Sequence, residues 1–311
     1  NNYDYKNIKL DGLLTDKKYD GSLTIEDPNI EFDFSGGIDF SQEVPVFNFQ
    51  ANLHKAKLDK LNFVEEDTTA NLSVSLISNF KGNNLDNAQG VIDFQKGRLT
   101  KNGNHLNFDN LNIDARHQDD TTKIYLKSDY IDGSLIGKYR STSVHQSLKN
   151  LFYSYLPVFI DSKTDTSQVK VKNNFELNID LKNTRPITEI FLPKLEIGKN
   201  ANINLDYDGS EKYFNLTASS EAMKYKYYHF KKLNLVSRSQ DTIFSLIFDL
   251  DHLKFNPKEE ATYLNNYSLK SLTGNNKSKI LIDWDDPDNN SSKGEFIALV
   301  DFIKPMEKEN V

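Results

Sequence analysis

Histidines are the side chains of this sequence best suited to bind a metal ion or to transfer protons near neutral pH. No two of them have the i, i+2 or i, i+4 spacing that places paired metal ligands on one side of a strand or helix. The chain also has no cysteine, which excludes thiolate zinc sites and cysteine nucleophiles. We therefore expect solvated or packed histidines, no metal site and no cofactor. The histidines are His54, His105, His117, His145, His229 and His252.

Carboxylates are the second group that could do chemistry, because glycosidases use pairs of them. Two pairs lie close together along the chain: Asp33 with Asp39, and Asp109 with Asp114. Each alternates with apolar residues, so a solvated charge on the polar side of a strand is the expected role. The acidic run 285–290 lacks the glycine and glutamate of a calcium loop. Serine-hydrolase, phosphate-binding and dinucleotide motifs are absent, and we expect no enzyme activity.

The elements that carry these polar residues have the pattern of β-strands. Between Ile30 and Phe40, apolar residues or glycine alternate with polar residues, the pattern of a strand with one apolar side. Similar runs recur along the chain, separated by short turns that are too short for parallel crossovers. The sequence predicts an all-β fold, an elongated antiparallel sheet with one short amphipathic helix near the middle.

The predicted helix covers residues 142–157. Ser143 and Gln146 have the spacing of a capping box, and Pro157 marks the end of the helix. The apolar positions recur at helical spacing, so they form one apolar stripe along the helix. They are Val144, Leu148, Leu151, Phe152 and Tyr155. This helix separates an N-terminal β-meander, 1–141, from a C-terminal one, 158–311, and we expect one continuous elongated unit.

The strand before the helix changes phase. In 123–127 the apolar residues are the even-numbered ones, whereas from Ile131 onward they are the odd-numbered ones. A phase change flips the sides of a strand unless an extra residue is accommodated. The pattern therefore predicts a β-bulge near Ser128–Tyr130.

Composition limits the partners. Hydrophobic residues make up 37% of the chain and the net charge is −7, with acidic and basic residues interspersed. The absence of a basic patch argues against nucleic acid. No apolar run reaches the roughly 18–20 residues that cross a bilayer.

The apolar side of the strands has two interpretations. It could be the closed core of a β-sandwich, or it could face an open groove. The strands follow one another without the long connections of a Greek key. Gly21, Gly133 and Gly137 occupy apolar positions, which suggests that this side needs room or curvature. Both observations favour the groove.

Several segments together resemble TamB-like proteins of the AsmA-like superfamily, of the Bacteroidetes type. The segment Ser128–Tyr139, followed by a helix that ends in Tyr155-Leu156-Pro157, is the main one. The other segments are Tyr19–Ile25 with Asn29–Gly36, Pro45–Phe49 with Ala56–Asn62, and Phe191–Leu195 with Leu205–Gly209.

This resemblance implies an elongated antiparallel β-sheet curled into a taco-like groove, part of which the apolar stripe of the helix at 142–157 would cover. It also implies a periplasmic envelope protein, anchored to the inner membrane by a segment outside this chain. Such proteins are linked to phospholipid transport between the two membranes and to outer-membrane biogenesis and protein secretion. The implied partners are phospholipid acyl chains, a TamA-like outer-membrane barrel and the rest of a longer chain. Under this interpretation the groove-lining candidates are Ile30, Phe32, Phe34, Ile38, Phe40, Phe47, Phe49, Phe108, Ile113, Phe175, Leu177 and Ile179.

Two other functions remain open. Exposed sheet edges could act as a scaffold or chaperone for outer-membrane strands. Alternatively, the chain could be a carbohydrate-binding β-sandwich, in which sugars stack on exposed rings. Tyr125, Tyr227 and Tyr228 are the aromatic residues at polar positions that fit the latter.

Overall fold

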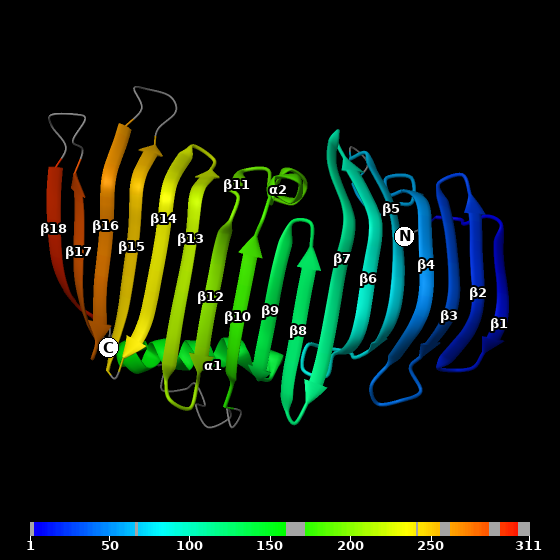
Figure 1. Ribbon diagram of the computed structural model, residues 1–311, viewed down its shortest axis with the longest axis horizontal. Coiled ribbons are helices and arrows are strands. Elements are labelled where there is room, and N and C mark those ends of the chain that lie inside the picture. The colour runs from blue at the N-terminus through cyan, green and yellow to red at the C-terminus, as the bar shows by residue number, and fades with distance from the viewer. Residues whose placement is uncertain are drawn as a thin grey trace, which may run out of the picture. The chain divides into compact units, whose positions relative to one another are not determined.

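The computed structural model describes residues 3–65, 68–159, 172–240, 242–255, 262–285 and 293–303. These residues form eighteen β-strands, the α-helices α1 (Ser141–Tyr155) and α2 (Arg185–Phe191), and a short 3-10 helix at Pro157–Phe159 (Figure 1). The prediction of an all-β, antiparallel fold is confirmed. The expected helix at 142–157 corresponds to α1, whereas α2 is an additional helix.

The strands are β1 (Ile8–Leu14), β2 (Lys18–Asp27), β3 (Ile30–Asp39), β4 (Val46–Lys57), β5 (Ala70–Lys81), β6 (Gln89–Lys101), β7 (Asn104–Gln118), β8 (Thr121–Ser128), β9 (Ile131–Lys138), β10 (Asn174–Leu181), β11 (Leu195–Ile197), β12 (Ala201–Asp208), β13 (Tyr213–Tyr225), β14 (Tyr228–Gln240), β15 (Ile243–Phe255), β16 (Thr262–Gly274), β17 (Lys277–Asp285) and β18 (Lys293–Asp301).

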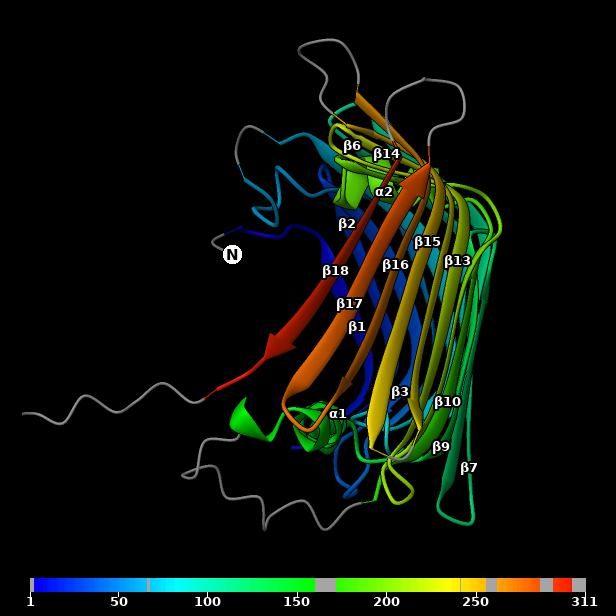
Figure 2. The same cartoon turned by 90° about the vertical axis from the view of Figure 1, so that its left-hand side faces the viewer.

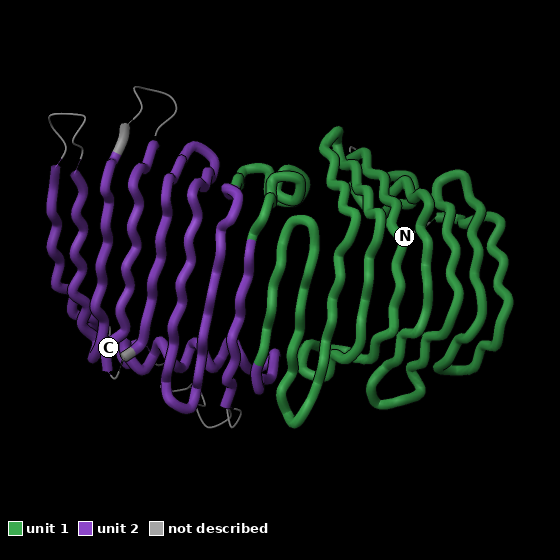
Figure 3. Tube along the Cα trace, in the orientation of Figure 1, with its two compact units in different colours: residues 1–136, 181–196 green, residues 137–180, 197–311 purple. Residues whose placement is uncertain are grey.

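The chain forms two compact units (Figure 3). Unit 1 consists of Asn1–Ile136 with Leu181–Glu196, and unit 2 of Gly137–Asp180 with Ile197–Val311. Helix α2 therefore belongs to unit 1 and helix α1 to unit 2.

Each unit is built around an antiparallel meander. In unit 1, every strand from β1 to β7 pairs with the next one along the chain. In unit 2, the same holds from β12 to β17. The strands of unit 2 turn progressively, so β18 is inclined to β13 (Figure 2), the usual twist of a sheet. Within each unit the paired strands form one layer, and no second described sheet of that unit covers it.

Large buried side chains gather where helices or turns cover the strand ends. In unit 1, Leu61 has no exposed surface and lies in the turn after β4. Ile190 of α2 is also buried, and the side-chain amide of Asn104, at the start of β7, donates to the Glu189 carbonyl oxygen at 3.3 Å. In unit 2, Leu151 and Tyr155 of α1 are buried in the same way. The strand ends, more than the strand centres, therefore hold the closed core.

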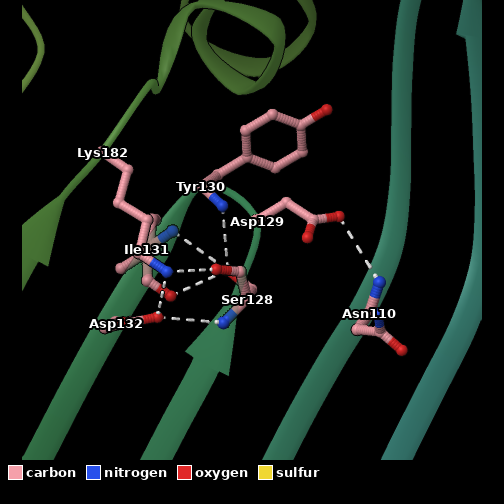
Figure 4. A network of polar contacts seen from close by, with 7 residues as sticks. All are labelled: Asn110, Ser128, Asp129, Tyr130, Ile131, Asp132 and Lys182. Atoms are coloured by element: carbon pink, nitrogen blue, oxygen red, sulfur yellow. Dashed lines mark hydrogen bonds and ion pairs between the residues drawn. The ribbon is translucent and has the colours of Figure 1, made fainter.

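The predicted bulge near Ser128–Tyr130 is wrong, because the chain turns there between β8 and β9 (Figure 4). The Ser128 hydroxyl donates to the Ile131 carbonyl oxygen at 2.7 Å and accepts from the Ile131 N–H at 3.0 Å. Asp129 accepts from the Asn110 N–H at 3.4 Å on the neighbouring β7. The phase change thus marks two strands joined by a tight turn. The alternation of apolar and polar residues alone cannot distinguish this arrangement from a single strand with a bulge.

A lysine from a distant part of the chain fixes this turn. The Lys182 ammonium group donates to the Asp132 carboxylate and to the Ser128 carbonyl oxygen, each at 2.7 Å (Figure 4). Burial raises the pKa of Asp132, but the hydrogen bonds from Lys182 and Ser128 outweigh it and leave the pKa below its ordinary value. Asp132 therefore stays ionised at neutral pH and holds the turn.

The capping role predicted for Ser143 is also wrong. Helix α1 begins at Ser141, and the N-cap position is Arg140, which makes no side-chain cap. The side chain of Asn173 accepts from the Arg140 N–H at 2.8 Å and donates to the Ser143 hydroxyl at 3.1 Å. The cap thus comes from a residue far along the chain, which local spacing cannot reveal.

Gly36 is expected to tolerate no side chain. Its φ is +130°, and a Cβ there would lie 2.4 Å from the Asn48 carbonyl oxygen on β4. We expect Gly36→Ala to lower the free energy of unfolding by about 2–3 kcal/mol, measured by urea unfolding followed by circular dichroism. Gly37→Ala is the matched control, because its Cβ would lie 3.2 Å from the flexible Asp20 carboxylate and at an ordinary 3.5 Å from the Tyr19 carbonyl oxygen. Equal losses in both variants would contradict the described backbone of β3.

Candidate functional site

The groove candidates of unit 1 lie on one side of its sheet. Residues directly opposite each other in an antiparallel pair point to the same side. Phe32 lies opposite Leu53, Phe34 opposite Ala51, and Ile38 opposite Phe47. The candidates on β7 join the same side, because Ile113 lies opposite Ile92, which lies opposite Ser78 and, through it, Phe49.

One continuous apolar row crosses seven strands of unit 1. Its members lie opposite one another from β1 to β7, and none of them is polar. They are Leu10, Leu23, Phe34, Ala51, Leu76, Phe94 and Leu111. We call the side of the sheet that carries this row the apolar face of unit 1.

This apolar face is only half covered. Among the unit 1 candidates Phe34 alone is buried, with 8% of its surface exposed. Phe40, which follows β3 and packs edge-on against Phe47, is 54% exposed. The other candidates of this unit are half-buried. A sealed sandwich core would bury large side chains of this kind almost completely.

Phe108 has a local role as well as a place on this face. It lies opposite Gly97, and a Cβ on Gly97 would fall 2.0 Å from its ring. The ring therefore covers the glycine, a device that stabilises glycines within a sheet.

The candidates on β10 belong to unit 2. Phe175 is buried, and its ring centroid lies 5.4 Å from that of Tyr207 and 6.1 Å from that of Tyr139. Leu177 and Ile179 follow on the same side of β10 and are half-buried.

Unit 2 has an apolar row that the sequence analysis did not select. It crosses seven strands from β12 to β18, and none of its members is fully buried. The alternation of Phe244, Leu246, Phe248 and Leu250 marks the apolar side of β15, but not the row across the strands. The row consists of Ile203, Ala218, Leu235, Phe248, Leu269, Ile282 and Phe296. We call the side that carries it the apolar face of unit 2.

Helix α1 crosses the strand ends of unit 2 (Figure 1). The ring of Phe152 lies 5.7 Å from that of Phe214 and 5.1 Å from that of Phe244. The ring of Tyr155 lies 5.6 Å from that of Phe244. Of the other helix candidates, Leu151 is buried, and Val144 and Leu148 are half-buried.

Backbone contacts hold the C-terminal end of α1 against the turn between β16 and β17. The Asn276 N–H donates to the Tyr155 carbonyl oxygen at 3.1 Å. The Asn276 side chain in turn accepts from the Val158 N–H at 2.7 Å. The helix thus covers one end of the apolar face of unit 2 and leaves the strand centres uncovered.

The histidines have separate partners. His54 lies 2.9 Å from the Asp33 carboxylate, and both side chains are half-exposed. His105 contacts the Thr100 hydroxyl at 3.1 Å, and His117 contacts that of Thr122 at 3.0 Å. Within the described ranges, no group of three histidine or acidic side chains is placed to hold a metal ion.

The tyrosines considered for sugar binding are exposed. Tyr125 is 37% exposed and lies beneath the Arg116 guanidinium at 5.9 Å. Tyr227 and Tyr228, at the tip of the β13–β14 hairpin, are 58% and 46% exposed. The described cavities are lined by other residues.

Comparison with protein-family models, with curated proteins and with solved structures gives no match. None of the described helices has both the length and the apolar character needed to cross a membrane.

Proposed function

We propose that this chain is a segment of a TamB-like envelope protein whose apolar faces carry phospholipid acyl chains through the periplasm, between the inner and outer membranes. The observation that carries the proposal is the unbroken apolar row in each unit, most of whose side chains keep part of their surface exposed. An acyl chain lying on such a row would cover the apolar surface that the protein leaves exposed to water. No catalytic residue is needed.

The dimensions fit this role. Neighbouring strands lie about 4.8 Å apart, so a row across seven strands is about 29 Å long. The hydrocarbon core of a bilayer is about 30 Å thick, and one acyl chain spans about half of it. Each row is therefore longer than one acyl chain, and a lipid can move along it from strand to strand.

The energy also favours an apolar path. Moving a 16-carbon chain into water costs about 12 kcal/mol, at about 0.8 kcal/mol per methylene. Contact with phenylalanine, leucine and isoleucine side chains offsets most of that cost, while the head group stays in water. In unit 1 the opposite side of the sheet carries polar residues such as Asp33, whose carboxylate lies 2.9 Å from His54, and these offer little contact to an apolar ligand.

Site-specific photocrosslinking tests the proposal. A photoreactive phenylalanine analogue at Phe49 or Phe248, each on an apolar face, should crosslink to phospholipid when the protein is expressed in a bacterial envelope. The same analogue at Ser35 or Lys270 is the control, because these positions lie on the opposite sides of β3 and β16. Equal lipid crosslinking from both sets would refute the proposal.

A scaffold for outer-membrane strands is the second candidate, and the edge strand β18 favours it. This strand pairs with β17 along one side. It exposes apolar residues on both sides of the sheet, with Phe296 53% and Leu299 80% exposed. Exposed apolar edges can add a further strand. Crosslinking from Leu299 to a TamA-like barrel, without lipid crosslinking from Phe248, would favour this candidate.

A further inference from the structure

A cavity of about 260 Å³ lies where α1 meets the strand ends of unit 2. One wall comes from α1, another from the residues before β10, and the third from the end of β12 and the turn after it. The lining residues are Ser147, Asn150, Leu151, Ser154, Lys172, Asn173, Tyr207, Gly209 and Lys212.

The inner wall of this cavity is a buried polar network. Asn173 has no exposed surface, and its side-chain amide donates to the Ser147 hydroxyl at 2.6 Å. Ser147 also shares a hydrogen bond with the hydroxyl of Tyr207, which is 1% exposed. Burial raises the pKa of Tyr207, so its hydroxyl is neutral at physiological pH. The wall is rigid and uncharged.

Among the described residues that line the cavity, both charged side chains are cationic. Lys172 and Lys212 are exposed and line it, and neither forms an ion pair with any residue in the described part of the chain. No carboxylate is among the described lining residues. Three carboxylates flank lining residues in the sequence. Asp206 alternates with Tyr207 on β12 and so points to the other side of the sheet, and Glu211 is exposed. Asp208 accepts hydrogen bonds from Asn174, Ser210 and Glu211. Burial raises the pKa of Asp208, but these hydrogen bonds outweigh it and lower the pKa. The Asp208 carboxylate is therefore ionised and hydrogen-bonded within its own turn.

A third donor faces the same cavity. The Asn150 side-chain oxygen accepts from Gln146 at 2.8 Å, which leaves its amide N–H groups as donors. Two lysine side chains and an amide thus line a space to which no described lining residue contributes an acid. This donor set suits a phosphate ester, whose oxygens accept charge-assisted hydrogen bonds.

The cavity also adjoins the apolar face. Tyr207 lines it and lies opposite Phe214, while its ring packs against Phe175. Polar donors and apolar rings therefore meet at one place, the arrangement that an amphipathic ligand requires. The volume is just below the range of pockets for drug-sized ligands, about 300–1,000 Å³, which suits a head group without its acyl chains.

We propose that this cavity binds the phosphate-ester head group of an anionic phospholipid, whose acyl chains lie on the apolar face of unit 2. Lys172 and Lys212 neutralise the phosphate, and Asn150 donates to one of its oxygens. This inference rests on the proposed function only for the source of the phosphate ester. The binding chemistry of the cavity stands independently of it.

Calorimetric titration of the whole chain tests the inference. The ligands are glycerol 3-phosphate, inorganic phosphate, and short-chain phosphatidylglycerol and phosphatidylcholine below their micelle concentrations. We expect phosphatidylglycerol to bind more tightly than phosphatidylcholine. The double variant Lys172→Gln/Lys212→Gln should bind glycerol 3-phosphate and phosphatidylglycerol about tenfold more weakly, because two charge-assisted contacts are lost.

A matched control separates this effect from net charge. Lys270→Gln/Lys279→Gln removes the same charge from exposed positions on neighbouring strands of unit 2, away from the cavity. It should leave all affinities unchanged. Equal weakening in both double variants, or in neither, would overturn the cavity as a phosphate-ester site.

The outcomes also separate this inference from the proposed function. If both short-chain lipids bind equally and the cavity lysines have no effect, the head-group site is refuted and the acyl-chain path stands. If glycerol 3-phosphate binds through the lysines and neither lipid binds, the cavity stands and the lipid path is refuted. If inorganic phosphate binds as tightly as phosphatidylglycerol, the site takes free phosphate and the lipid source is refuted.

Discussion

Tyr207→Ala is expected to lower the free energy of unfolding of unit 2 by about 3–5 kcal/mol. The side chain is 1% exposed, and its ring packs against that of Phe175 at the end of β12. Alanine would leave a cavity beneath α1 that the rigid strand ends cannot close. Urea unfolding followed by the fluorescence of Trp284, the single tryptophan of the chain, reports on this unit.

Two further variants are the controls for Tyr207→Ala. Tyr207→Phe keeps the ring and removes the hydrogen bond with Ser147, so we expect a loss of only about 1 kcal/mol. Tyr213→Ala removes a tyrosine that is 40% exposed on the facing strand, and it should change stability by no more than about 0.5 kcal/mol. A Tyr207→Ala variant no less stable than Tyr213→Ala would show that α1 does not close this end of the sheet.

Phe32→Glu is expected to reduce the phospholipid that co-purifies with the protein by at least about tenfold. Phe32 lies opposite Ile25 on β2 and Leu53 on β4, within the apolar face of unit 1. A carboxylate there would have to lose its hydration before an acyl chain could cover it, which costs several kcal/mol. Quantitative lipid extraction from equal amounts of purified protein measures the change.

Ser35→Glu is the control for this substitution. It adds the same charge to the same strand, but Ser35 lies opposite Ser22 and Gln50 on the other side of the sheet. Its lipid content should equal that of the unmodified protein. Circular dichroism of both variants should show an intact sheet, and a similar lipid loss in both would argue against a path along the apolar face.

The strands could be predicted because apolar and polar residues alternate along them. One side of each strand packs against its neighbours and the other faces water, and alternating sequences such as 30–40 record this directly. The apolar face of unit 1 follows from the same signal. The row in unit 2 was missed because its members are spread over strands β12 to β18, and only the register shows that they lie side by side.

Features that depend on distant residues could not be read from the sequence. Asn173 caps α1 from beyond the helix, so the local capping pattern at Ser143 was misleading. Lys182 fixes the turn at Ser128–Tyr130 from the far side of α1 in the sequence. The cavity beside α1 also draws its lysines from two separate loops, and neither lysine has a local motif.

Native mass spectrometry of the purified, unmodified protein tests the central claim most directly. If the apolar faces accept acyl chains, the protein released from bacterial membranes in a mild detergent should carry bound phospholipid. Collisional activation should then release intact lipid ions. A folded protein that remains free of lipid, also after incubation with phospholipid vesicles, would contradict the account.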